Sequence, residues 1–267
     1  MSRRDGYQPG VRCWVDVLGP DPRQLTGFYR ALFGWEFAGP GEMPGDGEYF
    51  VAQLRGRDVA GVGSLPPAAE APAFHTYIEV ESADRAAADV VEAGGTVLAE
   101  PVDAPPAGRL AVVADPEGAA FCVWEPRARR GAQLVNEPGA WSMSALIARD
   151  REGAAAFYGA AFGWQLETFR MGDMEMGLFR LPGYVGGEPS QPVPRDVVAA
   201  VMPLSEAPRA HWSVDFWVDD VDRATATATE LGGGVLAGPY DAPPFRQAVV
   251  ADPNGVAFSV SELNLPG

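Results

Sequence analysis

The chain has 267 residues, of which 47% are hydrophobic and 21% charged, within the range of ordinary globular proteins. Its formal net charge is −16, so most of its surface would repel nucleic acid and anionic membranes. Every basic residue is an arginine, which excludes a lysine Schiff base, a pyridoxal phosphate anchor and a Walker-type phosphate loop.

The cysteine content and the N-terminal residues point to a cytoplasmic protein. The two cysteines, Cys13 and Cys122, cannot form a disulfide framework, and no Cys/His cluster has zinc-site spacing. Residues 1–7 lack the apolar core of a signal peptide, and no apolar run of about 18 residues could span a bilayer.

The first predicted unit consists of a strand, a helix and further strands. Residues 13–18 favour a strand, and Asp21 can cap a helix whose apolar residues recur at helical spacing until Gly34 ends it. Short strands are expected at residues 48–54 and 58–65. We interpret this order as a βαβββ unit.

The same order follows in a second unit. A strand is predicted at residues 76–80 and a helix at 83–93, and strands follow at 97–99, 110–114 and 119–124. The chain therefore contains two consecutive βαβββ units before residue 127.

The second half of the chain repeats the first. Residues 28–35, with a Phe-Tyr pair and a Phe-Gly-Trp, return as residues 157–164, and residues 98–106 return as 236–244. Two segments that repeat in the same order indicate a tandem duplication. We predict an α+β protein of two domains, residues 8–127 and 138–264, with helices outside curved sheets.

Three features together resemble the vicinal oxygen chelate superfamily of glyoxalases, extradiol dioxygenases and bleomycin-resistance proteins. They are the paired βαβββ units, the Phe-Tyr helix with its Phe-Gly-Trp, and a closing Asp-Pro-x-Gly turn at 115–118 and 252–255. More narrowly, the chain is similar to tandem two-domain actinobacterial proteins of hydroxylase-like or antibiotic-biosynthesis type. The resemblance implies that each pair of units forms a cupped eight-stranded mixed sheet with outer helices.

The resemblance also implies positions for metal ligands on the inner walls of the cups. In the first domain these positions carry Trp14, His75 and Cys122. In the second they carry Met143, Ser213 and Ser259, with His211 two residues before Ser213. Tryptophan and methionine do not bind hard divalent ions, so we predict no metal site and no cofactor.

Other side chains of the first cup follow from the alternation of strands. If Trp14 points inward, Asp16 does too, and His75, Tyr77 and Glu79 share one face of the partner strand. We interpret His75, Asp16 and Glu79 as a candidate acid/base group, because imidazole titrates near neutral pH. A structural or solvent-exposed role for these residues is the alternative.

The remaining candidates are ligand-binding residues. In the first domain they are Trp14, Tyr77, Cys122, Trp124 and Arg109. In the second they are Met143, His211, Asp215 and Trp217. Aromatic walls with few polar groups suit a flat apolar ligand, although the tryptophans can equally be core, Cys122 an inert buried thiol and Arg109 an ion-pair partner.

The favoured function is a metal-independent protein of specialised metabolism that binds an aromatic, polyketide-like molecule and can convert it by acid/base chemistry, as a biosynthetic enzyme or accessory protein. A metal enzyme with an atypical ligand set and an antibiotic-sequestering protein are the alternatives. The partner is then a small molecule, with no nucleic acid or membrane, and the chain is a pseudo-dimeric monomer or a homodimer. The surviving histidine favours the first cup as the one that holds chemistry.

Overall fold

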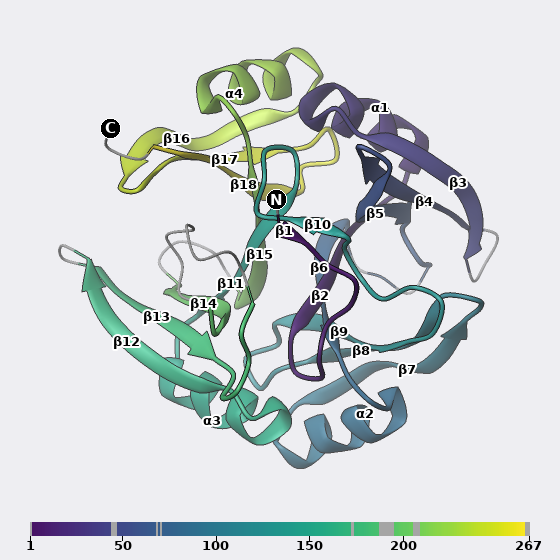
Figure 1. Ribbon diagram of the computed structural model, residues 1–267, viewed down its shortest axis with the longest axis vertical. Helices are drawn as coiled ribbons and strands as arrows, with labels where there is room; N and C mark the ends of the chain where they lie inside the picture. Colours follow the sequence, from purple (N-terminus) through teal and green to yellow (C-terminus); the bar gives the residue numbers. More distant parts are fainter. Residues whose placement is uncertain are drawn as a thin grey trace.

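The computed structural model describes residues 2–43, 47–67, 69, 71–171, 174–186, 195–204 and 209–264. Two eight-stranded sheets dominate it (Figure 1), and each forms one cup. We call them cup 1 and cup 2. In spatial order cup 1 consists of β3 (Glu36–Met43), β4 (Gly47–Leu54), β5 (Arg57–Ser64), β2 (Arg12–Gly19), β6 (Ala73–Glu79), β9 (Ala120–Pro126), β8 (Gly108–Ala114) and β7 (Thr96–Ala104).

Cup 2 repeats this order in the second half of the chain. It consists of β12 (Gln165–Met171), β13 (Met174–Arg180), β14 (Val197–Pro203), β11 (Trp141–Ala148), β15 (His211–Trp217), β18 (Ala257–Leu263), β17 (Phe245–Ala251) and β16 (Gly234–Ala242). The central strands of each cup are antiparallel, and each has a parallel neighbour on its other side. The predicted α+β class with two cupped mixed sheets is confirmed.

Within the described ranges four helices lie outside the cups: α1 (Pro22–Phe33), α2 (Ala83–Glu92), α3 (Arg151–Phe162) and α4 (Val221–Glu230). The α1 helix begins as predicted, because the Asp21 side chain accepts a hydrogen bond from the backbone N–H of Gln24. It ends at Gly34, whose φ of 71° is in the left-handed region that favours glycine. Asp150 and Gly163 repeat both caps in α3.

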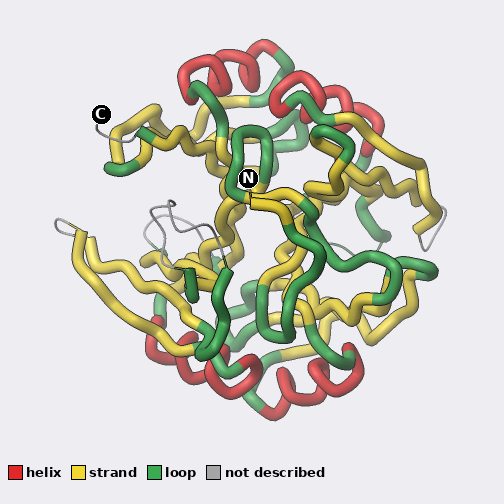
Figure 2. The backbone as a smooth tube through the Cα atoms, viewed as in Figure 1, coloured by secondary structure: helices red, strands yellow, loops and turns green. Residues whose placement is uncertain are grey.

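The cups stand back to back, and the helices pair between the two halves. Figures 1 and 2 show α1 beside α4 at one end and α2 beside α3 at the other, with the strands between. A short strand at the N-terminus, β1 (Ser2–Arg3), pairs with β10 (Leu134–Val135) in the segment that joins the domains. In Figure 1 β1 and β10 therefore lie at the centre of the view, between the two cups.

The repeated Phe-Tyr and Phe-Gly-Trp residues hold the two halves together. The Tyr29 hydroxyl donates to Asp252 over 3.0 Å, and the Trp35 indole donates to the carbonyl of Gly139 over 2.7 Å. Tyr158 and Trp164 make the reciprocal bonds, to Asp115 and to the carbonyl of Gly10. Each aromatic helix thus closes the core of the opposite domain, and the motif is structural.

Candidate functional site

A large cavity lies in cup 2 and has a volume of about 1020 Å³. Its walls are mainly aromatic and aliphatic, and all eight strands of the cup contribute side chains. They include Trp141, Met143, Phe169, Met176, Leu178, Tyr184, Trp217, Tyr240 and Phe245. A cavity of this size and composition can enclose a ligand the size of a small drug.

Asp215 is the acidic side chain of this cavity, and it stands in the middle strand β15. Its carboxylate accepts hydrogen bonds from the hydroxyls of Ser142 and Ser261, each over 2.5 Å, and Gln247 donates to Ser261 over 2.9 Å. Burial raises the pKa of Asp215 to about 6, although the two serine bonds lower it. A carboxyl group with this pKa can hold or release a proton close to neutral pH.

The other ligand-binding residues predicted in the second domain also line the cavity. Met143 and Trp217 contribute to its wall, and Trp217 lies against Phe245 with ring centroids 5.9 Å apart. His211 is exposed at the start of β15, where its Nδ1 lies 3.1 Å from the carbonyl oxygen of Arg209. The structure therefore brings Met143, His211, Asp215 and Trp217 together around one cavity.

In cup 1 the candidate ligand-binding residues are packed against one another. Trp14, Tyr77, Cys122 and Trp124 are all buried and belong to one continuous hydrophobic core. The ring of Tyr77 meets that of Trp124 edge to face at 6.2 Å. Burial, followed by the charge of Asp16, raises the pKa of the Cys122 thiol well above its ordinary value. This thiol is therefore neutral and a poor nucleophile.

A buried polar network surrounds Asp16, whose side chain is 1% exposed. One carboxylate oxygen accepts from the hydroxyls of Tyr77, over 2.6 Å, and Tyr49, over 3.0 Å. The Trp14 indole donates to Tyr49 over 2.9 Å, and Nδ1 of His75 lies 3.2 Å from the other oxygen of Asp16. Burial and Asp16 raise the pKa of both tyrosines, so their hydroxyls remain donors.

The three predicted acid/base residues differ in their access to solvent. The His75 side chain is 18% exposed, and a proton on Nδ1 facing Asp16 leaves Nε2 as an acceptor. Glu79 lies further along the same face of β6, and its Oε2 has no hydrogen-bond partner among the described residues. Burial raises the pKa of Glu79 to about 7, although Arg130 lowers it.

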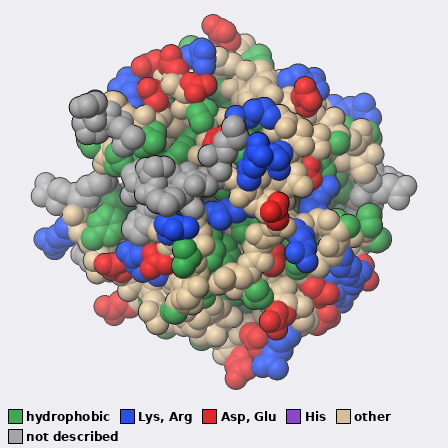
Figure 3. All heavy atoms as spheres, viewed as in Figure 1, with side chains coloured by type: hydrophobic (Ala, Val, Ile, Leu, Met, Phe, Trp, Pro, Cys, Tyr) green, Lys and Arg blue, Asp and Glu red, His purple; other side chains and the backbone are tan. Residues whose placement is uncertain are grey.

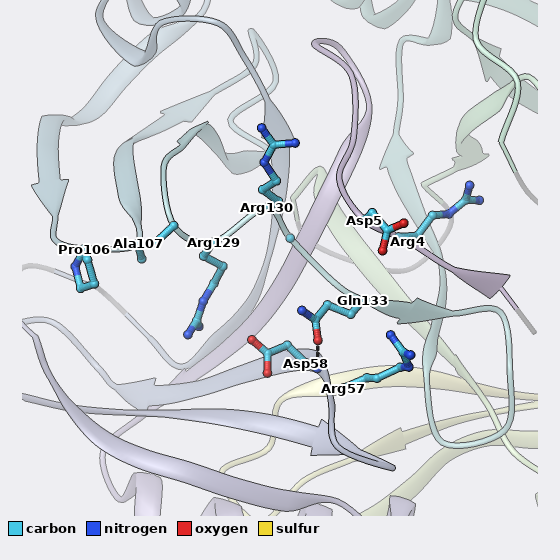
Figure 4. Close-up of a pocket in the computed structure, with 11 residues that line it drawn as sticks. Arg4, Asp5, Arg57, Asp58, Pro106, Ala107, Arg129, Arg130 and Gln133 are labelled. Atoms are coloured by element: carbon cyan, nitrogen blue, oxygen red, sulfur yellow. Dashed lines mark hydrogen bonds between the residues drawn. The ribbon is translucent and has the colours of Figure 1, made fainter.

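The segment that joins the domains covers one side of cup 1. Arg127 and Arg129 donate backbone hydrogen bonds to the carbonyl of Ala107, and the Trp124 indole donates to the carbonyl of Arg129. The Arg129 guanidinium lies over the Trp14 ring, 5.5 Å from its centroid. A polar pocket of about 330 Å³ remains beside this segment (Figure 4), lined by Arg4, Asp5, Arg57, Asp58, Arg129 and Arg130 among others.

Arg109 is already engaged by acidic residues. Its guanidinium makes two hydrogen bonds to Asp84, of 2.8 and 2.9 Å, and lies 3.3 Å from Asp103. Arg246 repeats the arrangement with Asp222 in the second domain. The role of Arg109 in ligand binding stays a prediction. The structure shows that Arg109, on β8, forms an ion pair with Asp84 on α2.

The comparison with protein families now explains the repeated architecture. The Glyoxalase-like domain family matches residues 14–124 and again residues 140–261. The chain belongs to this family. CFP32 of Mycobacterium tuberculosis (strain CDC 1551 / Oshkosh), named as a candidate glyoxylase, is 35% identical over 275 residues, which cover 97% of each chain. The anthracycline biosynthesis protein DauV of Streptomyces sp. (strain C5) is 34% identical over 274 residues, 96% of this chain and 94% of DauV.

Solved structures of glyoxalase-like proteins share the fold at lower identity. A Mn(II)-bound glyoxalase from Novosphingobium aromaticivorans is 18% identical with a TM-score of 0.63, covering 99% of this chain and 84% of that one. The 2,3-dioxygenase LapB from Pseudomonas sp. KL28 is 16% identical with a TM-score of 0.64, covering 98% and 96%. These matches support two glyoxalase-like domains in tandem.

The residues of this chain do not fit the metal centre that the family fold can carry. Across the ranges described above, no group of three or more His, Cys, Asp or Glu side chains could hold a metal ion. In cup 1 the one imidazole, His75, already faces Asp16, and Trp14 occupies a ligand position deep in the core.

Several residues of the two sites were not predicted from the sequence. Tyr49 binds Asp16 from β4, and Ser142 and Ser261 bind Asp215 from two different strands. Arg12 and Tyr240 also line the cup 2 cavity. Tyr49, Ser142 and Ser261 carry no motif, because their roles depend on which strands become neighbours.

Proposed function

We propose that the protein binds a flat, aromatic, polyketide-like small molecule in the cavity of cup 2, without a metal ion. The observation that carries this proposal is the cavity of about 1020 Å³ with mainly aromatic and aliphatic walls. Flat aromatic ligands gain affinity from stacking on tryptophan and tyrosine rings, which Trp141, Trp217 and Tyr240 can supply. Asp215 and its two serines add a polar group that can orient such a ligand.

The names of two relatives support this class of ligand. DauV is an anthracycline biosynthesis protein, and so is DnrV of Streptomyces peucetius, which is 34% identical over 271 residues. Both align with nearly the whole chain, including the strands that form cup 2. We infer a role in specialised metabolism, with a ligand of fused aromatic rings.

The test is direct binding of an anthraquinone dye, measured by equilibrium dialysis. We expect binding at one site per chain, unchanged after treatment with a chelator. Ser213→Trp places a large ring in the cavity wall and is expected to abolish binding, whereas Ala226→Trp on the outer face of α4 is a matched control that leaves it intact. Equal binding by both variants would place the dye outside cup 2 and refute the proposal.

A second candidate function is proton transfer by His75 and Asp16 in cup 1, with Glu79 as a further acid. The observation that favours it is the 3.2 Å contact between Nδ1 of His75 and the buried carboxylate of Asp16, with the imidazole still 18% exposed. A carboxylate that orients an imidazole in this way is a common arrangement for a general base.

This function is tested with the ligand that co-purifies with the protein, identified by native mass spectrometry. If the ligand is converted, His75→Ala is expected to lower kcat by about 100-fold while KM changes little. Full turnover in His75→Ala would rule out the acid/base role. Recovery of unchanged ligand would favour sequestration over catalysis.

A further inference from the structure

Arg12 is a buried cation in the wall of the cup 2 cavity, although it belongs to the first domain. It begins β2, where the pairing with β6 shifts register between Arg12 and Trp14. Its side chain is 9% exposed, and its guanidinium lies over the ring of Trp141, 4.9 Å from the centroid. Trp141 begins β11 and occupies the corresponding position in the duplicated half. The two copies of this position therefore meet beside one cavity.

No acidic side chain in the described part of the chain balances the charge of Arg12. Its Nε and Nη1 are buried from solvent and have no hydrogen-bond partner among the described residues. Burial lowers the pKa of Arg12 to about 10, which still leaves it charged at neutral pH. A buried, unpaired charge destabilises a folded protein, so its presence calls for a ligand that compensates it.

The rest of the cavity is also basic. Besides Arg12, the cavity is lined by Arg4, whose Nε has no partner, and by Arg195, which donates to the carbonyl of Gly186. Asp215 is the one acidic side chain among the described lining residues. In a chain of net charge −16, three arginines and one aspartate around one cavity are a local excess of positive charge. On the face that Figure 3 displays, by contrast, arginine and acidic side chains are interspersed.

On the basis of the proposed function, we propose that Arg12 is the anion-binding residue of cup 2 and that the ligand is an aromatic carboxylate. A guanidinium N–H donates a charge-assisted hydrogen bond to a carboxylate, and this bond is strongest where water is excluded. Nη2 is the nitrogen of Arg12 that remains available to the ligand, since Nε and Nη1 are sealed. The aromatic body then lies against Trp141 and the apolar walls, while one negative charge is compensated by Arg12.

Two probes of the same shape test the proposal: anthraquinone-2-carboxylate and its neutral analogue, anthraquinone-2-carboxamide. Isothermal titration calorimetry of the wild-type protein is expected to show binding of the carboxylate about tenfold tighter, or more, than of the carboxamide. Arg12→Met should remove this preference and leave the carboxamide affinity within about twofold, because it keeps the length and apolar stem of arginine. Arg12→Lys should retain part of the preference.

Arg129→Met is the matched control, since Arg129 also lies over a tryptophan, Trp14, but in cup 1. It should keep the full preference for the carboxylate. Arg12→Met should in addition raise the Tm of the unliganded protein, because it removes an uncompensated buried charge. A purely structural arginine would have the opposite effect on Tm.

The outcomes separate this proposal from the function on which it rests. Equal affinity of the wild-type protein for both probes would overturn the role of Arg12 and leave the aromatic-ligand function standing. An unchanged preference of Arg12→Met for the carboxylate over the carboxamide would likewise overturn the role of Arg12 and leave the aromatic-ligand function standing. Failure of both probes to bind the wild-type protein would overturn both proposals.

Discussion

Cup 1 and cup 2 have the same strand order, but their interiors differ. In cup 1 the inner wall is filled by large side chains that bond to one another around Asp16. In cup 2 smaller or more flexible side chains occupy five of the matching positions and leave a cavity of about 1020 Å³, although Trp217 there matches Glu79. The matching pairs are Trp14 and Met143, Asp16 and Ala145, Tyr77 and Asp215, Cys122 and Ser259, and Trp124 and Ser261.

This difference shows how a duplication can divide two tasks between its copies. A fold that is stable with one filled cup can tolerate a second cup whose interior is hollow and carries polar groups, because the filled cup supplies buried apolar area. The segment after β9 also covers cup 1, while the loop between β16 and β17 lines the open cavity of cup 2. The comparison therefore favours cup 2, rather than cup 1, as the place of the proposed ligand.

The largest expected effect comes from truncating the matching residues Trp14 and Met143. Trp14 is buried in a filled cup, so Trp14→Ala leaves a cavity in the core and should lower the free energy of unfolding by about 4 kcal/mol. Met143 already borders a cavity, so Met143→Ala should cost about 1 kcal/mol or less. Urea denaturation followed by circular dichroism measures both, and equal losses would contradict the comparison.

A smaller effect is expected at Gly61, which pairs with Asp16 across the parallel strands β2 and β5. A Cβ at Gly61 would lie 1.9 Å from the Tyr49 hydroxyl, so Gly61→Ala must displace Tyr49 from Asp16. We expect a loss of about 2 kcal/mol in the free energy of unfolding, from overpacking and a broken buried hydrogen bond. Urea denaturation is again the measurement.

The control for Gly61 lies in cup 2, where the matching position is Ala200. Ala200→Gly should cost about 1 kcal/mol or less, through chain entropy alone. In cup 1 the double variant Gly61→Ala/Tyr49→Ala should recover part of the lost stability, relative to the sum of the two single variants, because the Tyr49 atoms that the new Cβ would meet are gone. If the double variant recovers no stability, the loss in Gly61→Ala does not come from displacing Tyr49 from Asp16.

The smallest effect is a pH dependence of stability from Glu79 in cup 1. The pKa of Glu79 is raised from its ordinary 4.5 to about 7, so the folded protein holds this proton more tightly than the unfolded chain. The stability it contributes is complete below pH 4.5 and is lost as the pH rises to about 7. Glu79→Gln should therefore lose less stability than the wild-type protein across this window, by about 1 kcal/mol.

Asp215 in cup 2 provides the comparison, because its pKa is raised from 3.8 to about 6. Asp215→Asn should change the pH dependence of stability between these two pH values. The change should be smaller than that of Glu79→Gln, because Asp215 opens onto the cavity. Thermal unfolding at a series of pH values measures both variants. An identical pH profile for Glu79→Gln and the wild-type protein would show that Glu79 is not held in a buried, protonated form.

The fold was predictable from the sequence because its signals are local and occur twice. The Asp21 cap, the Gly34 stop and the alternating strands depend on near neighbours in the chain, and the repeat confirmed each element independently. The outermost strand β3 was missed, because a Gly-Pro-Gly segment within it disfavours strand structure. Such residues are tolerated there because an edge strand bonds on one side only.

The interiors of the cups were only partly predictable. Strand alternation placed His75, Tyr77 and Asp16 on one wall, and the structure joins the three by hydrogen bonds. Alternation does not give the volume between two walls, so the sequence favoured cup 1 for its histidine while the large cavity lies in cup 2. Whether chemistry takes place in cup 1 stays a prediction. Arg12 carried one usable signal, since its duplicated position holds a tryptophan.

The reciprocal bonds from Tyr29 to Asp252 and from Tyr158 to Asp115 have a consequence for the history of the protein. Each half makes the same bond to the other, as the two subunits of a two-fold symmetric homodimer do, but here both halves belong to a single polypeptide. In a duplicated chain the equivalent residues of the two halves can differ. Arg12 and Trp141 are such a pair, and they lie face to face. A cation that faces an indole at equivalent positions is unavailable to a symmetric pair of identical subunits, and it requires two copies whose sequences differ.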